Sequence, residues 1–226
     1  MKPRALDLFC GAGGASMGLH LAGFDVTGVD LHPQPEYPFA FVQADALEVD
    51  LASYDFVWSS PPCQRYSAAT RQSGKAADHP DLVDPVRRRL IDSGLPYVIE
   101  NVLGAPLLGP IMLCGSMFGL GVVRHRLFET SFLCLAPPHP RHAGSLVTGE
   151  YVTVAGNGGV PAWTLKERER RGLPRHREGE YSLATWQAAM GIDWMSRSTL
   201  VQAIPPAFAE YIGRAALAAI EARRAA

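Results

Sequence analysis

The chain passes from its first predicted strand into its first predicted helix through Asp7-Leu8-Phe9-Cys10-Gly11-Ala12-Gly13-Gly14. The apolar run Ala5–Phe9 predicts the strand, and Ala15–Ala22 predicts the helix. Glycines between the two let the backbone bend sharply and approach a ligand closely. The turn is not a dinucleotide-binding fingerprint, because Ser16 stands at the third glycine position, and it is not a P-loop, because no Gly-Lys-Ser/Thr follows.

Apolar runs and helical stretches continue to alternate through the first two thirds of the chain. Further strands are predicted at Val26–Val29, Phe56–Ser59, Tyr97–Ile99 and Arg126–Phe132, and further helices at Leu82–Asp92 and Pro206–Arg223. This alternation is typical of an α/β fold built on a largely parallel sheet. Residues 132–182 are rich in proline, glycine and arginine, which predicts a loop-rich insert packed beside the sheet.

The composition is that of a globular protein of 226 residues, with 47% hydrophobic and 19% charged residues. The formal net charge of −1 gives no overall basic field, although a local basic surface would suffice for binding nucleic acid. Four cysteines without framework spacing, and no signal peptide before the first apolar run, favour a reducing cytosol. We find no CxxC or HxxxH spacing, so the sequence predicts no metal site.

One uncharged segment, Val102–Val123, is long enough to cross a bilayer. Two prolines and five glycines interrupt it, which would break a membrane helix repeatedly. We therefore expect buried strands and tight loops here, in a soluble cytoplasmic protein.

Acidic residues follow the apolar runs after the glycine-rich turn. Asp30 closes the run Val26–Val29, at a place where a carboxylate can bind both ribose hydroxyls of a nucleoside. Asp45 follows the third apolar run, at another strand's carboxyl edge. Helix-capping acids beside an ordinary turn would give the same pattern, but the turn and Asp30 together favour an adenosyl ligand.

A cysteine follows the strand predicted at Phe56–Ser59, in the loop Ser59-Ser60-Pro61-Pro62-Cys63-Gln64. Two prolines restrict the backbone, so the thiol of Cys63 is held in one place, as a nucleophile requires. A buried free cysteine is the alternative, and it fits Cys10, Cys114 and Cys134 better than Cys63.

Glu100-Asn101-Val102 ends the strand predicted at Tyr97–Ile99. A glutamate at the tip of an apolar strand is costly unless it points into a polar cleft, and partial burial raises its pKa toward that of a proton donor. Arg124-His125-Arg126 precedes the next strand and can bring two guanidinium groups to the same cleft. Taken alone, this cluster could equally be a charged turn.

These groups together match the needs of one reaction. Attack of a thiolate on C6 of cytosine makes C5 nucleophilic, provided that an acid protonates or hydrogen-bonds N3. A methyl sulfonium held nearby can then transfer its methyl group to C5. The reaction needs a placed cysteine, a glutamate facing N3, an arginine toward O2 and an adenosyl pocket, and the sequence offers one candidate for each.

The motifs resemble those of the cytosine-5 DNA methyltransferases and occur in that family's order. The matching pieces are the glycine-rich turn, Asp30, Asp45, Pro61-Pro62-Cys63-Gln64, Glu100-Asn101-Val102, Arg124-x-Arg126, Gln187–Trp194 and Gln202-Ala203-Ile204-Pro205-Pro206 through Tyr211-Ile212-Gly213. The resemblance implies a Rossmann-like α/β methyltransferase sheet that binds S-adenosylmethionine. It also implies that the last motif folds back to complete the cofactor pocket.

By this resemblance Cys63 is the nucleophile, Glu100 holds N3 of the base, and Arg126 approaches O2 with Arg124 in support. The base must leave its duplex stack to reach the thiol. The positions implied for the cofactor are Phe9, Cys10, Gly11, Ala12, Gly13, Gly14, Asp30, Leu31, Asp45, Ala46, Pro62, Leu82 and Ala203. Phe9 would contact the adenosyl group, the glycine backbone the methionine part, Asp30 the ribose and Asp45 the adenine amino group.

The chain departs from the family pattern at two positions. Val122 stands where the family commonly has the glutamine of Gln-x-Arg-x-Arg. Val201-Gln202 replaces the usual Gly-Asn of the last motif, which leaves the fit around the methionine part open. A modified sulfonium donor is therefore an alternative.

The segment that corresponds to the family's target recognition region is short. Its basic residues are Lys166, Arg168, Arg170, Arg171, Arg175 and Arg177, interrupted by two glutamates. They predict either a solvated charged helix or contacts with DNA phosphates, which position a protein without specifying sequence. Gly156-Asn157-Gly158-Gly159 could approach the DNA backbone or form an ordinary turn. We expect a short or relaxed sequence preference.

These expectations divide the chain into a catalytic and cofactor-binding core (1–131), a small recognition region (132–182) and a C-terminal segment returning to the core (183–226). The predicted substrate is double-stranded DNA, the predicted state is a monomer, and the origin is a compact restriction-modification system or a virus. The alternatives are a relative that acts on tRNA or transfers a larger group, and a catalytically silent nucleic-acid-binding module. The intact set of Cys63, Glu100 and Arg126 argues against the silent module.

Overall fold

The computed structural model describes residues 1–142, 145–155, 162–176, 179–180 and 182–225. The described residues form a twisted sheet of seven strands in the order β3-β2-β1-β4-β5-β7-β6. The strands are β1 (Arg4–Leu8), β2 (Asp25–Asp30), β3 (Ala40–Gln43), β4 (Phe56–Ser59), β5 (Tyr97–Asn101), β6 (Ile111–Leu113) and β7 (Arg126–Thr130). The α/β fold predicted from the sequence is confirmed.

The first five strands are parallel, and β7 lies antiparallel between β5 and β6. This antiparallel pair brings the start of β7 beside the end of β5, since Asn101 pairs with Leu127. The prediction of a largely parallel sheet is therefore correct for β1 to β5. The predicted strand Arg126–Phe132 is present but ends at Thr130. The strand β6, which pairs with it, was not predicted.

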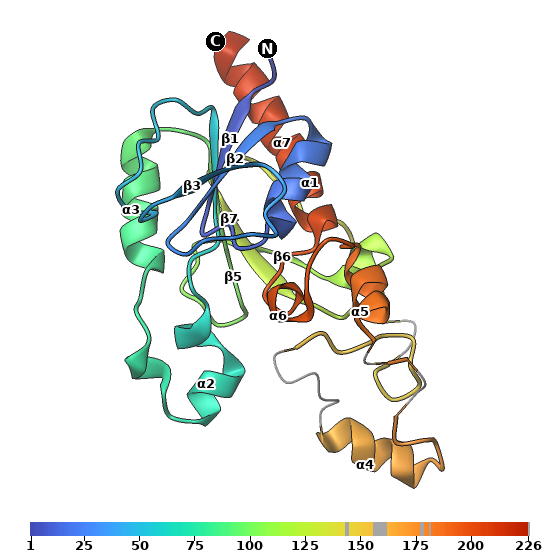
Figure 1. Cartoon of the computed structure of the whole chain (residues 1–226). Helices are drawn as coiled ribbons and strands as arrows, with labels where there is room; N and C mark the ends of the chain where they lie inside the picture. Colours follow the sequence, from blue (N-terminus) through green and yellow to red (C-terminus); the bar gives the residue numbers. More distant parts are fainter. Residues whose placement is uncertain (143–144, 156–161, 177–178, 181, 226) are drawn as a thin grey trace.

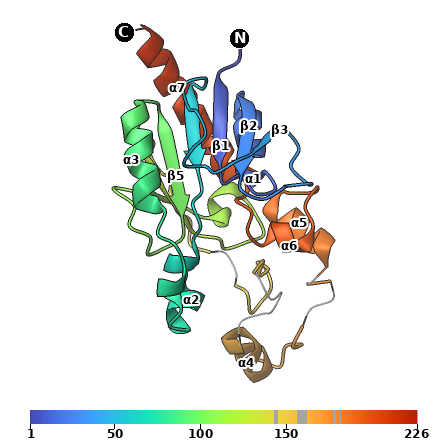
Figure 2. The same ribbon diagram turned by 60° about the vertical axis from the view of Figure 1, so that its left-hand side comes forward.

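Helices cover both faces of the sheet (Figures 1 and 2). Helices α1 (Gly14–Ala22) and α7 (Pro206–Ala225) lie on one face, and α3 (Val83–Ser93) lies on the other. Successive side chains of a strand point to opposite faces, so Ala5 packs toward α1 and α7 while Leu6 and Leu8 pack toward α3. The same alternation directs Asp7 to the face of α1, where Ser16 contacts it.

The remaining helices are short and lie near the carboxyl edge of the sheet or beyond it. They are η1 (Gln64–Tyr66), α2 (Ala68–Gln72), η2 (Ala76–Asp78), η3 (Gly115–Phe118), α4 (Ala162–Arg170), α5 (Leu183–Met190) and α6 (Arg197–Leu200). Figures 1 and 2 show α4 standing apart from the sheet, within segment 132–182. No helix in the described part of the chain is both long and apolar enough to cross a bilayer.

Candidate active site

The glycine-rich turn leaves the end of β1 through a strained backbone. Gly11 (φ +49°) and Gly13 (φ +85°) adopt left-handed conformations, and Phe9 (φ +60°) is the non-glycine residue with positive φ among those described. A Cβ added to Gly11 would meet no heavy atom within 4 Å, so open space lies beside the turn. A strained, open backbone turn at a strand end suits the close approach of a ligand.

Asp30 ends β2 beside this turn. One carboxylate oxygen accepts a hydrogen bond from the Gly11 N–H (3.1 Å), and the other accepts one from the His32 N–H (3.1 Å). Each carboxylate oxygen can accept a second hydrogen bond, so the group remains able to bind a pair of ribose hydroxyls. Asp30 therefore fixes the turn, and its predicted contact with a ribose stays a prediction.

The C-terminal segment lies directly on the turn. A Cβ at Gly14 would lie 2.3 Å from the backbone oxygen of Ile204, so glycine is required for this approach. The indole N–H of Trp194 donates to the carbonyl of Ala12 (2.9 Å). Ala12 and Ala203 also share a buried cluster with Trp186. The last motif thus folds back over the glycine-rich turn.

Asp7 is buried at the root of the turn, a role that the sequence analysis missed. Its carboxylate accepts a hydrogen bond from the Ser16 hydroxyl, which also contacts the Tyr37 hydroxyl at 2.8 Å, while its second oxygen has no hydrogen-bond partner. Burial raises the pKa of Asp7 to about 7. The serine that replaces the third glycine of a dinucleotide fingerprint therefore holds a buried acid in place.

The other positions implied for the cofactor lie near the same edge. Asp45 and Ala46 follow β3, whose end pairs with the end of β2. Asp45 is exposed and accepts a hydrogen bond from the Leu47 N–H, whereas Ala46 is buried. Leu31 is exposed, Cys10 is buried, and Pro62 and Leu82 are half-buried. Their contacts with a cofactor stay predictions.

The loop that carries Cys63 is anchored by its neighbours. The Ser60 N–H donates to the carbonyl of Leu8 (3.1 Å), and the Asn101 amide donates to the carbonyl of Pro61 (2.9 Å). Cys63 itself is half-buried and caps η1. Asn101 therefore ties the proline-rich loop to β5. In the sequence, only the position of Asn101 next to Glu100 indicates that Asn101 has a role at the site.

Glu100 and Arg126 form an ion pair between the adjacent ends of β5 and β7, with 3.1 Å between Oε1 and Nε. Burial raises the pKa of Glu100, as its sequence position predicts, while Arg126 and Arg124 oppose that shift. The Ser60 hydroxyl also bonds to Glu100. A buried acid with a raised pKa is suited to hydrogen-bonding or protonating a ring nitrogen.

Cys63 lies within the electrostatic field of this ion pair. Burial raises the pKa of the Cys63 thiol, the Glu100 carboxylate raises it further, and Arg126 lowers it. The structure thus brings Cys63, Glu100 and Arg126 into one cluster, beside the carboxyl edge that holds the glycine-rich turn. A thiol, an acid and a guanidinium in one cluster can perform nucleophilic addition to an electron-poor ring.

Arg124 is held by two backbone carbonyls beside the site, and its predicted supporting role at the base stays a prediction. Its two terminal nitrogens donate to the backbone oxygens of Val154 (3.1 Å) and Val201 (2.7 Å), and it is buried. Burial lowers the pKa of Arg124 to about 9. Arg124 therefore ties segment 145–155 and the C-terminal segment to the site. Val122, at the position of the family's glutamine, is buried in the cluster that contains Trp186.

Arg168 of α4 is neither solvated nor free to contact phosphates, so the prediction for the basic run is wrong at this residue. Arg168 is 1% exposed, forms an ion pair with Glu180 (2.9 Å) and donates to the backbone oxygens of Leu146 and Val147. The backbone of segment 145–155 and the carboxylate of Glu180 thus enclose its guanidinium. The other described basic residues of the run are exposed, namely Lys166, Arg170, Arg171 and Arg175. Arg177 and Gly156–Gly159 lie outside the described residues.

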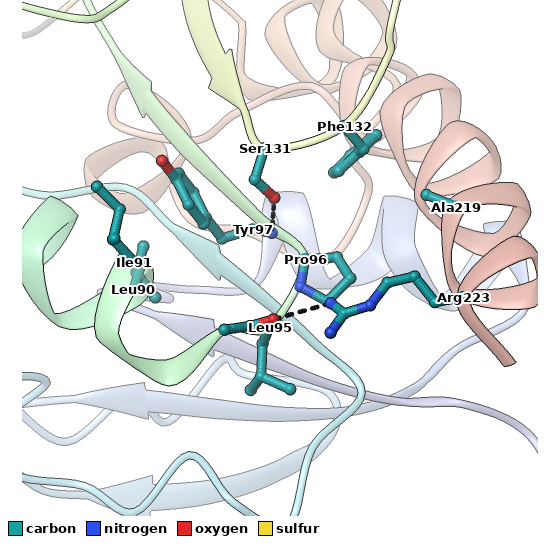
Figure 3. Close-up of a pocket in the computed structure, with 10 residues that line it drawn as sticks. Leu90, Ile91, Leu95, Pro96, Tyr97, Ser131, Phe132, Ala219 and Arg223 are labelled. Carbon is teal, nitrogen blue, oxygen red and sulfur yellow. Dashed lines mark hydrogen bonds between the residues drawn. The ribbon is translucent and has the colours of Figure 1, made fainter. Parts of the chain in front are cut away.

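A hollow of about 460 Å³ lies at the opposite edge of the sheet, where β5 begins (Figure 3). Leu90, Pro96, Tyr97 and Arg223 line it, and Arg223 donates to the carbonyl of Gly94 (2.8 Å). None of the predicted site residues lines this hollow. Ligands of open parallel sheets bind at the carboxyl ends of the strands, so the hollow is not the candidate site.

The strand order and the glycine-rich turn define an α/β methyltransferase fold. Two solved structures resemble the whole chain at this level. A putative DNA modification methyltransferase encoded within a prophage of E. coli has a TM-score of 0.57 at 16% identity, covering 98% of this chain and 100% of that one. Dnmt2 methyltransferase of S. pombe has a TM-score of 0.57 at 14% identity, covering 97% and 99%. At these identities the likeness establishes the fold alone.

Sequence comparison identifies the family over the N-terminal part. Residues 4–105 match the model of the C-5 cytosine-specific DNA methylases, the family whose motifs the sequence resembles. The chain is 30% identical over 125 residues to type II methyltransferase M.AquIA of Picosynechococcus, covering 46% of this chain and 50% of that protein. It is 30% identical over 114 residues to type II methyltransferase M.HgiCI of Herpetosiphon aurantiacus, covering 44% and 27%. The chain thus spans at most half the length of these curated relatives.

Proposed function

We propose that this protein is a DNA cytosine-5 methyltransferase that uses S-adenosylmethionine. The observation that carries the proposal is the cluster of Cys63, Glu100 and Arg126 beside the open glycine-rich turn. The family match over residues 4–105 supports it, because the match contains the turn, the cysteine loop and Glu100. The names of the curated relatives favour DNA as the substrate.

Residues at the turn fit an adenosyl group and a methionine moiety. The open space beside Gly11 admits a ligand to the backbone, and Asp30 keeps acceptor capacity for the ribose hydroxyls. Phe9 and the backbone from Gly11 to Gly14 would complete the pocket under the C-terminal segment. When bound there, S-adenosylmethionine supplies the electrophilic methyl group of its sulfonium.

Cys63 begins the proposed reaction. Its thiol loses a proton to solvent and the sulfur bonds to C6 of cytosine. Glu100, having taken up a proton from solvent, donates it to N3, and the C5=C6 electron pair becomes available at C5. After C5 has gained the methyl group, its hydrogen leaves to a water base as a proton. The C5=C6 bond re-forms, the C6–S bond breaks, N3 returns its proton to Glu100, which releases it to solvent, and the Cys63 thiolate regains a proton from solvent. Atoms and charges therefore balance over the cycle.

Arg126 positions this chemistry. Its ion pair with Glu100 holds the carboxyl group at the end of β5, and its guanidinium is available to the base O2 at the rim of the cleft, where it is 18% exposed. A cytosine in a duplex cannot reach a half-buried thiol, so the target base must leave the stack. Exposed basic side chains of α4 would contact phosphates and position the DNA without specifying a long sequence.

Mass spectrometry of nucleosides tests the proposal directly. Duplex DNA and tRNA are each incubated with the protein and S-adenosylmethionine, digested and examined for methylated cytosine. We expect 5-methyldeoxycytidine in the DNA. Methylation of tRNA alone would show that the substrate is RNA and would reject DNA. A cytosine carrying a group heavier than methyl would show that the donor is a modified sulfonium and not S-adenosylmethionine. Sequencing of the modified positions should show a short or relaxed recognition site.

A trapping experiment tests the covalent step separately. A duplex with 5-fluorocytosine at a modified position should form a stable adduct with the wild-type protein, because fluorine at C5 cannot leave as a proton does. Cys63→Ser should bind S-adenosylhomocysteine normally, form no adduct and lose turnover. Cys134→Ser, which changes a buried cysteine outside the cluster, is the matched control. Turnover by Cys63→Ser would reject the nucleophile.

A further inference from the structure

Four side chains of metal-ligating type meet outside the candidate active site. They are Cys114, His125, His139 and His142, and their ligand atoms all lie within 4.8 Å of one another. The sequence spacing indicates no such site, since the four residues come from three separate parts of the chain. We propose that this cluster binds one zinc ion, or a chemically similar divalent transition metal, and fastens the recognition insert to the catalytic sheet.

The distances fit a tetrahedral ion. The Nε2 atoms of His125 and His139 lie 3.2 Å apart, and Cys114 Sγ lies 3.5 Å from His142 Nε2. Zinc bonds of about 2.0–2.1 Å to nitrogen and about 2.3 Å to sulfur place two tetrahedral ligands roughly 3.3–3.6 Å apart. Both separations are therefore close to those of ligands that share one zinc ion, and the remaining pairs, all within 4.8 Å, would close slightly around it.

The donor set selects the class of metal. One thiolate and three imidazoles are borderline-soft ligands, which favour zinc over calcium or magnesium. Four protein ligands fill a tetrahedral shell and leave no open position for a substrate or a reactive water. Such a closed shell is typical of structural zinc sites rather than catalytic ones.

Two hydrogen bonds orient the Cys114 sulfur. The sulfur accepts hydrogen bonds from the Ser116 hydroxyl (3.2 Å) and from the backbone N–H of Met117. Hydrogen bonds to a ligand from a second layer of residues orient that ligand toward the metal. Metal binding would release the Cys114 proton to solvent, because a cysteine ligand binds as the thiolate.

The positions of the ligands indicate what the metal would hold together. Cys114 follows β6, and His125 directly precedes β7, between Arg124 and Arg126. His139 and His142 belong to the loop that leaves the sheet toward α4, and both are exposed. The described part of this loop, 131–142, contains no helix or strand that could anchor it. A metal would thus anchor the start of the insert beside the strand that carries Arg126.

Metal content of the purified full chain tests the inference without relying on methyl transfer. Elemental mass spectrometry should find one zinc per chain after expression in zinc-supplemented medium. After removal of zinc by a chelator, added Co²⁺ should give the visible bands of a tetrahedral site and the near-ultraviolet band of a cobalt–thiolate bond. His139→Ala should weaken Co²⁺ binding by about tenfold or more, since even supporting residues of metal sites contribute that much.

The variants separate this site from incidental binding. Cys114→Ser should remove the cobalt–thiolate band. Because Cys114 is buried, this variant can fail to fold. In that case His139→Ala, at an exposed position, tests the site instead. His20→Ala, an exposed histidine of α1, is the matched control and should bind the metal as the wild type does. A folded wild type without tetrahedral Co²⁺ bands, or equal binding by His139→Ala, would overturn the inference. Either result would leave the proposed methyl transfer unaffected.

Discussion

Arg126, at the start of β7, forms an ion pair with Glu100, near the end of β5, with 3.1 Å between Nε and Oε1. The two residues meet because β7 runs antiparallel to β5. The arginine balances a carboxylate that burial would otherwise drive toward its neutral form. The same carboxylate raises the pKa of the Cys63 thiol. Burial is the main cause of the raised pKa, so the free protein holds its nucleophile mainly as a thiol, and the ion pair adjusts how readily that thiol ionises.

Glu100→Gln should make Cys63 more reactive while abolishing methyl transfer. Removal of the negative charge lowers the pKa of the thiol, because the Arg126 cation then acts on it without opposition. The rate of alkylation by iodoacetamide near pH 8 should rise severalfold, measured by mass spectrometry of the Cys63 peptide. Glu48→Gln, at an exposed site, should leave the rate unchanged. An unchanged or slower rate in Glu100→Gln would show that the carboxylate does not govern the thiol.

Gly14→Ala should weaken cofactor binding and stability together. The new Cβ would lie 2.3 Å from the Ile204 oxygen, so the C-terminal segment must move off the glycine-rich turn. Such overpacking costs about 1–3 kcal/mol. Urea unfolding and calorimetric titration with S-adenosylhomocysteine measure the two effects. Leu21→Ala, on the exposed side of the same helix, is the control; equal behaviour of the two variants would contradict the close approach.

Because of Asp7, the free energy of unfolding should fall as the pH rises from about 4 to about 7. Its pKa is about 7 in the folded chain, against an ordinary value of 3.8, so the folded state keeps a proton that the unfolded state loses. The stabilising contribution is complete below about pH 4 and is lost as pH rises through 7, at no more than about 1.4 kcal/mol per pH unit.

Asp7→Asn removes this titration while keeping an oxygen that can accept from Ser16. The variant should gain stability relative to the wild type between pH 5 and pH 8, as measured by urea unfolding at both values. Asp25→Asn, at the exposed start of β2, should show no such change. A wild-type advantage that stays constant over this range would mean that Asp7 is ionised throughout.

Arg168→Ala should unfold the α4 region. Arg168 and Glu180 are 1% and 3% exposed in their side chains, and removal of Arg168 takes a buried ion-pair partner away from the carboxylate. Loss of such a partner costs about 3–5 kcal/mol. Limited proteolysis and hydrogen exchange should show faster opening of residues 162–176. Arg170→Ala removes an exposed partner of Glu167 and should change little; similar opening in both variants would rule out a buried centre in the insert.

Local pattern alone was enough to predict the α/β fold, the glycine-rich turn and the family motifs. Apolar runs of strand length bounded by glycine and proline placed β1, β2, β4 and β5, because buried parallel strands read as continuous hydrophobic stretches. Polar residues at the ends of such strands must lie at one edge of a parallel sheet. The candidates Cys63, Glu100 and Asp30 could therefore be selected from their positions in the sequence.

Contacts between distant segments could not be read from that pattern. The burial of Arg168, the use of Arg124 by two loop carbonyls and the unpaired oxygen of Asp7 each depend on which segments meet. The meeting of Cys114 with His125 and two loop histidines depends on the antiparallel return of β6 and β7. Sequence periodicity reports which side of an element is buried, whereas these partners were decided only when the chain folded and brought separate elements together.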